Sequence, residues 1–261
     1  MDKSTLSIVK IGGNIIENKD ELQAFLKLFV QIPGKKILVH GGGKEATFMA
    51  SKLGISSKMI DGRRITDAES LKVITMVYAG LLNKNITASL QSMDCNAMGM
   101  SGADGNSITS TKRPVKSIDY GWVGDVTFVN NENIKKLLDS DFTPVFCALT
   151  HDEKGQLLNT NADTIAAELG KSLSDLYDVS LFYCFELPGV LKDISDPNSV
   201  IKTLNTTLYD QLLKENIISA GMLPKLTNCF EALKNGVQKV YIGNQSMFQE
   251  NETNFTTISL Q

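Results

Sequence analysis

Two glycine-rich turns, each at the end of a short apolar segment near the N-terminus, constrain this chain more than any other feature. The first turn, Gly12-Gly13, follows residues 6–11, and the second, His40-Gly41-Gly42-Gly43, follows residues 37–39. Consecutive glycines let backbone N–H groups approach an anion closely, because no Cβ stands in the way. Lys10 adds a positive charge beside the first turn. We therefore interpret the two turns as phosphate-binding elements at the edge of a sheet.

Neither turn matches the commoner nucleotide-binding motifs. A Walker A loop requires Gly-x-x-x-x-Gly-Lys-Ser/Thr, and Gly43-Lys44-Glu45 has neither the spacing nor the hydroxyl. A dinucleotide fingerprint requires Gly-x-Gly-x-x-Gly at one strand–helix turn, which no segment supplies. The predicted phosphate site is therefore neither a Walker A loop nor a dinucleotide-binding turn.

The composition excludes several classes of protein. The chain has 261 residues, is 42% hydrophobic and 21% charged, and carries a net charge of −3, which favours neither a nucleic acid nor a membrane as partner. Its four cysteines are scattered without a Cys-x-x-Cys pair or a histidine cluster, so we expect no protein-bound metal and buried, reduced thiols. No signal peptide or apolar run of ~20 residues is present, which predicts a cytoplasmic protein.

Strand and helix signals alternate along the chain, which predicts an α/β fold with a mostly parallel central sheet and helices on both faces. We expect strands near residues 6–11, 36–39, 144–149, 180–184 and 239–242, and helices near 20–30, 48–53, 66–82, 162–169 and 226–233. Asp20 is the predicted N-cap of the first helix, and Thr66 and Glu69 are predicted to form a capping box. Alternating residues between 107 and 130 predict β-hairpins. The weakly patterned residues 171–178 predict a boundary between two lobes that share one sheet.

Three carbonyl-bearing side chains gather at the start of the helix predicted at residues 162–169. The segment reads Asn159-Thr160-Asn161-Ala162-Asp163. Helix capping and turn formation explain one or two of these residues. If the segment is extended, positions 159, 161 and 163 project together toward a ligand at the strand ends. Both interpretations stay open from these residues alone.

Two further cations stand just before predicted helices. Lys225 follows Pro224 at a helix start, where a lysine and the helix N-terminus suit a phosphate, although a solvent-exposed lysine is the commoner case. Arg64, in Gly62-Arg63-Arg64-Ile65-Thr66, is able to hold a carboxylate with two parallel hydrogen bonds. Adjacent arginines also occur in ordinary solvated loops, so each cation has two open interpretations.

Taken together, these segments resemble the amino acid kinase family, in the right order along nearly the whole chain. The matching motifs are Lys10 with Gly12-Gly13, the His40–Gly43 turn, and residues 61–66, 155–163 and 221–225. Arg64-Ile65-Thr66 and the Asn-x-Asn-Ala-Asp segment resemble the branch that acts on N-acylated glutamate. The aspartate, uridylate and carbamate kinases of the family carry different residues there.

The resemblance implies phosphorylation of the side-chain (γ) carboxylate of an N-acyl-L-glutamate, the second step of arginine biosynthesis. ATP would be the co-substrate, with Mg²⁺ bound mainly through its phosphates. The implied roles are as follows: Lys10 and Lys225 flank the transferring phosphoryl group, Asp163 holds both lysines, Gly12, Gly13, Gly42 and Gly43 bind phosphates, Arg64 binds the α-carboxylate, and Asn159 and Asn161 bind the amino-acid substrate. A carboxylate nucleophile is ionised at neutral pH, since its pKa is about 4.3, and needs no general base. We therefore expect His40 and His151 to be structural.

The chain departs from the family at one motif, and two alternatives to the implied function remain. Where the family usually has Ser/Thr-Asp-Val-x-Gly-Val/Ile, this chain reads Phe185-Glu186-Leu187-Pro188-Gly189-Val190, which leaves the adenine contacts unassigned. The alternatives are a kinase for another acyl amino acid, such as an acylated aminoadipate, and a catalytically silent sensor. The acyl group is also open between acetyl and a charged acyl such as succinyl, for which Lys112 or Arg113 would supply a cation.

The resemblance also carries expectations about domains and assembly. Residues 1–174 would form the acyl-amino-acid-binding and dimerisation lobe, and residues 175–261 the nucleotide-binding lobe. Arginine-inhibited family members have an extra N-terminal helix that links dimers into hexamers. Lys10 lies nine residues after Met1, which leaves no room for that helix. We therefore expect a homodimer with little inhibition by free arginine.

Overall fold

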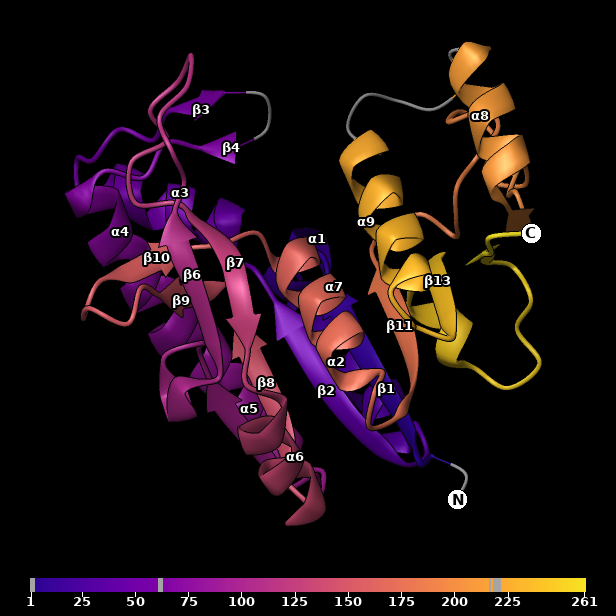
Figure 1. The fold of residues 1–261 in the computed structure, drawn as a ribbon, viewed down its shortest axis with the longest axis horizontal. Helices are drawn as coiled ribbons and strands as arrows, with labels where there is room; N and C mark the ends of the chain where they lie inside the picture. Colours follow the sequence, from indigo (N-terminus) through magenta and orange to yellow (C-terminus); the bar gives the residue numbers. More distant parts are fainter. Residues whose placement is uncertain (1–2, 61–62, 216, 218–221) are drawn as a thin grey trace. The chain divides into compact units, whose positions relative to one another are not determined.

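The computed structural model describes residues 3–60, 63–215, 217 and 222–261. Packing divides the chain into two compact units, the first made of Met1–Lys36 with Ala166–Gln261 and the second of Ile37–Ile165. The mostly parallel α/β fold predicted from the alternation of strand and helix signals is confirmed (Figure 1). The predicted assignment of functions to residues 1–174 and 175–261 stays a prediction. Asp61, Gly62 and Gly221, which belong to the quoted motifs, lie outside the described residues.

The strands of the first unit follow one another in the order β12-β14-β13-β11-β1. Their bounds are β1 (Thr5–Ile11), β11 (Asp178–Cys184), β12 (Thr203–Leu204), β13 (Lys239–Gly243) and β14 (Thr256–Ile258). β1 runs parallel to β11, with Lys10 opposite Tyr183, and β11 runs parallel to β13. The apolar residues of β1 are fully buried, because helices and strands cover a parallel sheet on both faces. Because these side chains are packed in the core, the position of the last residue of β1, just before the first glycine turn, is well defined.

The helices that lie wholly or mainly in the first unit are α1 (Gly13–Glu17), α2 (Lys19–Gln31), α7 (Ala162–Leu173), α8 (Thr206–Lys214) and α9 (Leu223–Lys234). A short 3₁₀ helix, η3 (Gln245–Phe248), follows β13. The predicted N-cap of α2 was wrong. Asn18 has the extended backbone of an N-cap, and its side chain accepts the N–H groups of Asp20 and Glu21. Asp20 instead lies in the first turn, where an acidic side chain stabilises the helix dipole.

The second unit contains a parallel group of strands in the order β2-β8-β5 and several helices. The bounds are β2 (Lys35–His40), β5 (Ala97–Met100), β8 (Thr143–Cys147), α3 (Gly43–Lys52), α6 (Asn131–Asp139), and one long helical run of α4 (Ala68–Thr75), the π-helical η1 (Met76–Leu82) and α5 (Asn83–Gln91). The predicted capping box at Thr66 was wrong. Asp67 caps α4 by accepting the N–H of Ser70, whereas the Thr66 side chain is buried.

The hairpin predicted between residues 107 and 130 is confirmed. β6 (Ile108–Lys112) and β7 (Gly124–Val129) run antiparallel, side by side in Figure 1, in a four-stranded sheet ordered β10-β9-β6-β7. The remaining members are β9 (Leu149–His151) and β10 (Leu157–Asn159), while β3 (Met59–Ile60) and β4 (Arg63–Arg64) pair separately, and η2 (Asp104–Asn106) is a 3₁₀ turn. The apolar run predicted as one strand at 144–149 is divided between β8 and β9. No helix in the described part of the chain combines the length and apolarity needed to cross a bilayer.

Candidate active site

The first glycine turn joins β1 to α1 in the first unit. The Gly12 N–H donates to the carbonyl of Cys184 at 2.8 Å, so it is already used inside the protein. The role proposed for this turn in phosphate binding therefore rests on Gly13, the first residue of α1. Lys10 is the penultimate residue of β1, two positions before Gly12, and is half-buried. Its charge acts on the Cys184 thiol, whose pKa burial nevertheless raises to about 12.

Lys225, in the first turn of α9, lies on an aromatic ring. Its Nζ is 4.4 Å from the centroid of the Phe185 ring, directly after β11. A ring face attracts an ammonium group, so the Phe185 ring helps to position the Lys225 cation. Phe185 opens the motif in which this chain departs from the family that it resembles. The first unit thus places Gly12 and both lysines around the Cys184–Phe185 segment, and sequence reasoning missed the part played by Phe185.

The second glycine turn joins β2 to α3 in the second unit. Gly42 has a φ of +150°, and a Cβ at this position would overlap the Leu82 side chain and lie 3.1 Å from the Tyr78 ring. Only glycine combines this backbone conformation with so little space. Gly43 then starts α3, and among the described residues the N–H groups of Gly42 and Gly43 have no backbone acceptor. Both groups are therefore available to an anion at the helix N-terminus.

Arg64 is a buried cation beside this turn. It is 8% exposed, and its Nη2 donates to the Gly43 carbonyl at 2.8 Å and to the Thr47 hydroxyl at 2.6 Å. Among the described residues, no carboxylate pairs with it, and its Nη1 and Nε have no acceptor. Burying an unpaired charge is costly, so a buried guanidinium without a counter-ion indicates that an anionic ligand supplies one. The carboxylate-binding role expected of Arg64 stays a prediction.

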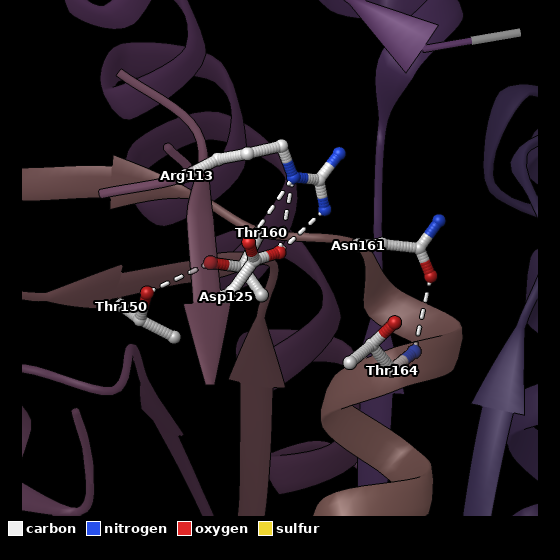
Figure 2. A network of polar contacts seen from close by, with 6 residues as sticks. All are labelled: Arg113, Asp125, Thr150, Thr160, Asn161 and Thr164. Carbon is white, nitrogen blue, oxygen red and sulfur yellow. Dashed lines mark hydrogen bonds and ion pairs between the residues drawn. The ribbon is translucent and has the colours of Figure 1, made fainter. Parts of the chain in front are cut away.

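The polar segment before α7 contains a helix cap and a hydroxyl pair (Figure 2). The Asn161 side chain accepts the Thr164 N–H at 3.0 Å, which makes Asn161 the helix cap. The hydroxyl groups of Thr160 and Thr150 form a buried hydrogen bond at 2.7 Å. Asn159 ends β10, and its amide donates to the Thr66 hydroxyl at 3.0 Å. Asp163 lies in the first helical turn, so residues 159, 161 and 163 do not form the extended row considered from the sequence.

Residues around Arg64 thus form a connected group in the second unit. The Thr66 hydroxyl, which receives the Asn159 amide, lies 3.4 Å from the Arg64 carbonyl. Arg64 in turn contacts Gly43. The predicted substrate-binding residues Gly42, Gly43, Arg64 and Asn159 are therefore brought together, whereas Asn161 has a capping role and is exposed.

The two cations that the sequence offered for a charged acyl group differ in their surroundings. Arg113 pairs with Asp125, and its Nε lies 3.1 Å and 3.2 Å from the two carboxylate oxygens (Figure 2). That pair satisfies the charge of Arg113. Lys112 lies 4.6 Å from the centroid of the Trp122 ring and is exposed. Arg113 is therefore a poor candidate for this role, and Lys112 remains open.

His40 is structural, as expected from the sequence. It is fully buried, and its Nδ1 lies 2.8 Å from the Gly41 carbonyl while its Nε2 lies 3.0 Å from the Asn83 amide nitrogen. Burial lowers the pKa of His40 to about 4. The neutral His40 ring is hydrogen-bonded to Gly41 and so helps to hold the second glycine turn in place.

Comparisons of this sequence with known proteins place the chain in a family. The chain matches the family model described as the amino acid kinase family over residues 5–244. A relative from Cytophaga hutchinsonii, named acetylglutamate kinase, is 54% identical, with 91% of this chain and 90% of the relative covered. A relative of the same name from Bacteroides thetaiotaomicron is 51% identical, with 96% and 97% covered.

Solved structures support the fold. The crystal structure of smu.665 from Streptococcus mutans has a TM-score of 0.77 at 22% identity and covers 98% of this chain and 99% of its own. Carbamate kinase from Giardia lamblia, bound to AMP-PNP, has a TM-score of 0.70 at 14% identity, with 99% of both chains covered. The resemblance predicted from the sequence is confirmed, and the chain belongs to the amino acid kinase family.

Proposed function

We propose that this chain transfers the γ-phosphoryl group of ATP to the side-chain carboxylate of N-acetyl-L-glutamate, in arginine biosynthesis. The single observation that carries the proposal is the buried Arg64 guanidinium, which has no carboxylate partner among the described residues. It suits the α-carboxylate of an acylated amino acid, beside a glycine turn that suits the transferring phosphoryl group. Relatives at 51–54% identity that are named acetylglutamate kinase support the same substrate.

The chemistry needs positioning and positive charge more than acid–base catalysis. An oxygen of the ionised γ-carboxylate attacks the γ-phosphorus, the bond to the β-phosphate oxygen breaks, and ADP leaves. Lys10 and Lys225 stabilise the charge on the phosphoryl and leaving oxygens, and Asp163 holds the lysines in register. The N–H groups of Gly13, Gly42 and Gly43 bind phosphate oxygens, and Asn159 binds the amino-acid substrate. No buried histidine is required as a base, in keeping with the low pKa of His40.

ATP enters this scheme as its magnesium complex. Magnesium in phosphoryl-transfer sites is commonly held by phosphate oxygens, water and one or two carboxylates. Among the described residues, no three or more His, Cys, Asp or Glu side chains gather as a metal cage. We propose that the magnesium ion is held mainly through the ATP phosphates. We further propose that the enzyme is a cytoplasmic homodimer, and that the acyl group is acetyl, with a bulkier acyl such as succinyl as the alternative.

The test is an ADP-release assay with a panel of acidic amino acids. We expect turnover with N-acetyl-L-glutamate and none with free glutamate, aspartate or carbamate, and hydroxylamine should trap the acyl phosphate. N-succinyl-L-glutamate and N-acetyl-L-aminoadipate in the same panel distinguish the alternatives.

Lys225→Ala should lower kcat by roughly 10²–10³-fold, the usual cost of removing one donor from developing charge. Lys234→Ala, at the exposed end of the same helix, is the matched control. No ADP release with any acylated acid would refute the proposal and favour a silent sensor.

A further inference from the structure

The Tyr78 hydroxyl lies beside the second glycine turn. Tyr78 is 5% exposed, and its ring runs along the turn: a Cβ on Gly42 would lie 3.1 Å and 3.2 Å from two ring carbons, and a Cβ on Gly43 would lie 3.8 Å from the hydroxyl oxygen. Gly43 is also the residue whose carbonyl accepts Arg64. The hydroxyl and the guanidinium therefore approach the same glycine.

The Tyr78 hydroxyl lacks a hydrogen-bond partner among the residues that the structure describes, and its oxygen is not one of the fully buried unpaired atoms, so it is accessible beside the turn. A hydroxyl donor without a protein partner, open beside the glycine turn, is able to donate to a ligand that binds there. Its surroundings indicate the kind of ligand. Both the guanidinium of Arg64 and the free N–H groups at the start of α3 are donors, so the shared partner is an acceptor with negative charge. A carboxylate meets this description.

The backbone that presents Tyr78 is unusual in the same place. Tyr78 is the third residue of η1, a π-helical segment within an otherwise α-helical run. Such segments are rare, because their hydrogen bonds are less favourable, and they frequently occur at functional sites. In this unit η1 packs against α3, which begins at the glycine turn. The π-helical turn thus directs the buried Tyr78 and the Leu82 side chain onto Gly42.

We propose that Tyr78 is a further substrate-binding residue, which donates its phenolic hydrogen to the same substrate carboxylate that Arg64 binds. This inference rests on the function proposed above and extends it, because it adds a neutral donor to the guanidinium. Burial raises the pKa of Tyr78 while the nearby Arg64 charge opposes that rise, so the phenol stays protonated at neutral pH and acts as a donor.

The test compares Tyr78→Phe with wild type, since this change removes one hydroxyl and keeps the ring on Gly42. We expect the KM for N-acetyl-L-glutamate to rise about 10- to 100-fold, in line with the loss of a hydrogen bond to a charged group, with kcat and the KM for ATP nearly unchanged. Tyr120→Phe is the matched control, because Tyr120 lies in the same unit with its ring against Arg113. It should leave every constant unchanged.

Two further measurements separate a binding role from a structural one. In an Arg64→Ala background, Tyr78→Phe should cost less than it does alone, because both side chains bind one carboxylate. With the α-amide of N-acetyl-L-glutamate as substrate, wild type and Tyr78→Phe should become similar. Equal KM values for wild type and Tyr78→Phe, with the wild type active, would overturn the role of Tyr78 alone. A wild type inactive on N-acetyl-L-glutamate would instead overturn the proposed function.

Discussion

At the scale of single residues, His40 shows how a buried side chain fixes the orientation of a glycine turn. The Asn83 amide nitrogen donates to the Val145 carbonyl at 2.9 Å and to His40 Nε2. Because Nε2 then accepts, the ring proton lies on Nδ1 and is donated to the Gly41 carbonyl. This chain of hydrogen bonds, assigned from the network, holds the Gly41–Gly42 peptide and so directs the Gly42 N–H away from the ring.

The low pKa of His40 predicts a defined loss of stability in acid. The unfolded chain binds a proton below the ordinary pKa of 6.5, whereas the folded protein does so only near pH 4. Stability is therefore complete above pH 6.5 and falls as the pH is lowered toward 4. From pH 7.5 to pH 5, His40 alone should lower the free energy of unfolding by about 2 kcal/mol.

Urea unfolding at the two pH values measures this effect. The His40→Gln variant lacks the titrating group, so its free energy of unfolding should change by about 2 kcal/mol less than that of wild type between them. An identical pH dependence in both proteins would show that His40 does not become protonated on unfolding in this range.

Residue types predicted part of this site and missed the rest for a physical reason. Arg64 was a candidate from the sequence, because a guanidinium is able to hold a carboxylate and the residues around Arg64 resemble a family motif, although a solvated loop was equally open. Tyr78 and Phe185 were not, because an aromatic residue in an apolar pattern has the same appearance in a core as in a site. Their roles depend on which glycine or lysine packs against them, and that is set by tertiary contacts.

At the scale of elements, the second glycine turn depends on the π-helical segment packed against it. We predict that Gly42→Ala abolishes activity and destabilises the protein by several kcal/mol, because a Cβ there would overlap Leu82 and the φ of +150° is strained for alanine. Gly54→Ala is the matched control. Gly54 also has a positive φ, of +71°, but nothing lies within 4 Å of its added Cβ.

The Gly54→Ala variant should lose only about 1 kcal/mol, the cost of the backbone conformation, and keep full activity. Thermal unfolding measures the stability of both variants, and the ADP-release assay measures their activity. If Gly42→Ala were as active and as stable as Gly54→Ala, close packing at the turn would not be what requires glycine.

Elements were more predictable than their ends. Strands such as β1 and β11 follow from short runs rich in apolar β-branched or aromatic residues, and the hairpin of β6 and β7 follows from alternation. The caps were misassigned because Asp20 and Thr66 are good capping residues that stand two and one positions from the ones used. The π-helical turn of η1 was not predictable, since its apolar pattern also fits an α-helix.

At the scale of the whole molecule, exposed apolar side chains on η1 allow a prediction about assembly. Met76 and Leu81 are 55% and 43% exposed, and residues five apart share a face in a π-helix. Phe48, on the neighbouring α3, is also exposed. Exposed apolar groups that gather on packed elements commonly mark an interface.

We predict that this face pairs with the same face of a second copy, giving a two-fold homodimer of twice the 28.5 kDa chain mass. Light scattering should report that mass for wild type, and Leu81→Glu should shift the protein toward the monomer, because a charge would be buried in the contact. Phe128→Glu, at an exposed apolar position on β7, is the control and should stay dimeric. The dimer should also show little inhibition by free arginine. A hexamer mass, a dimeric Leu81→Glu variant or strong inhibition by sub-millimolar arginine would contradict this assembly.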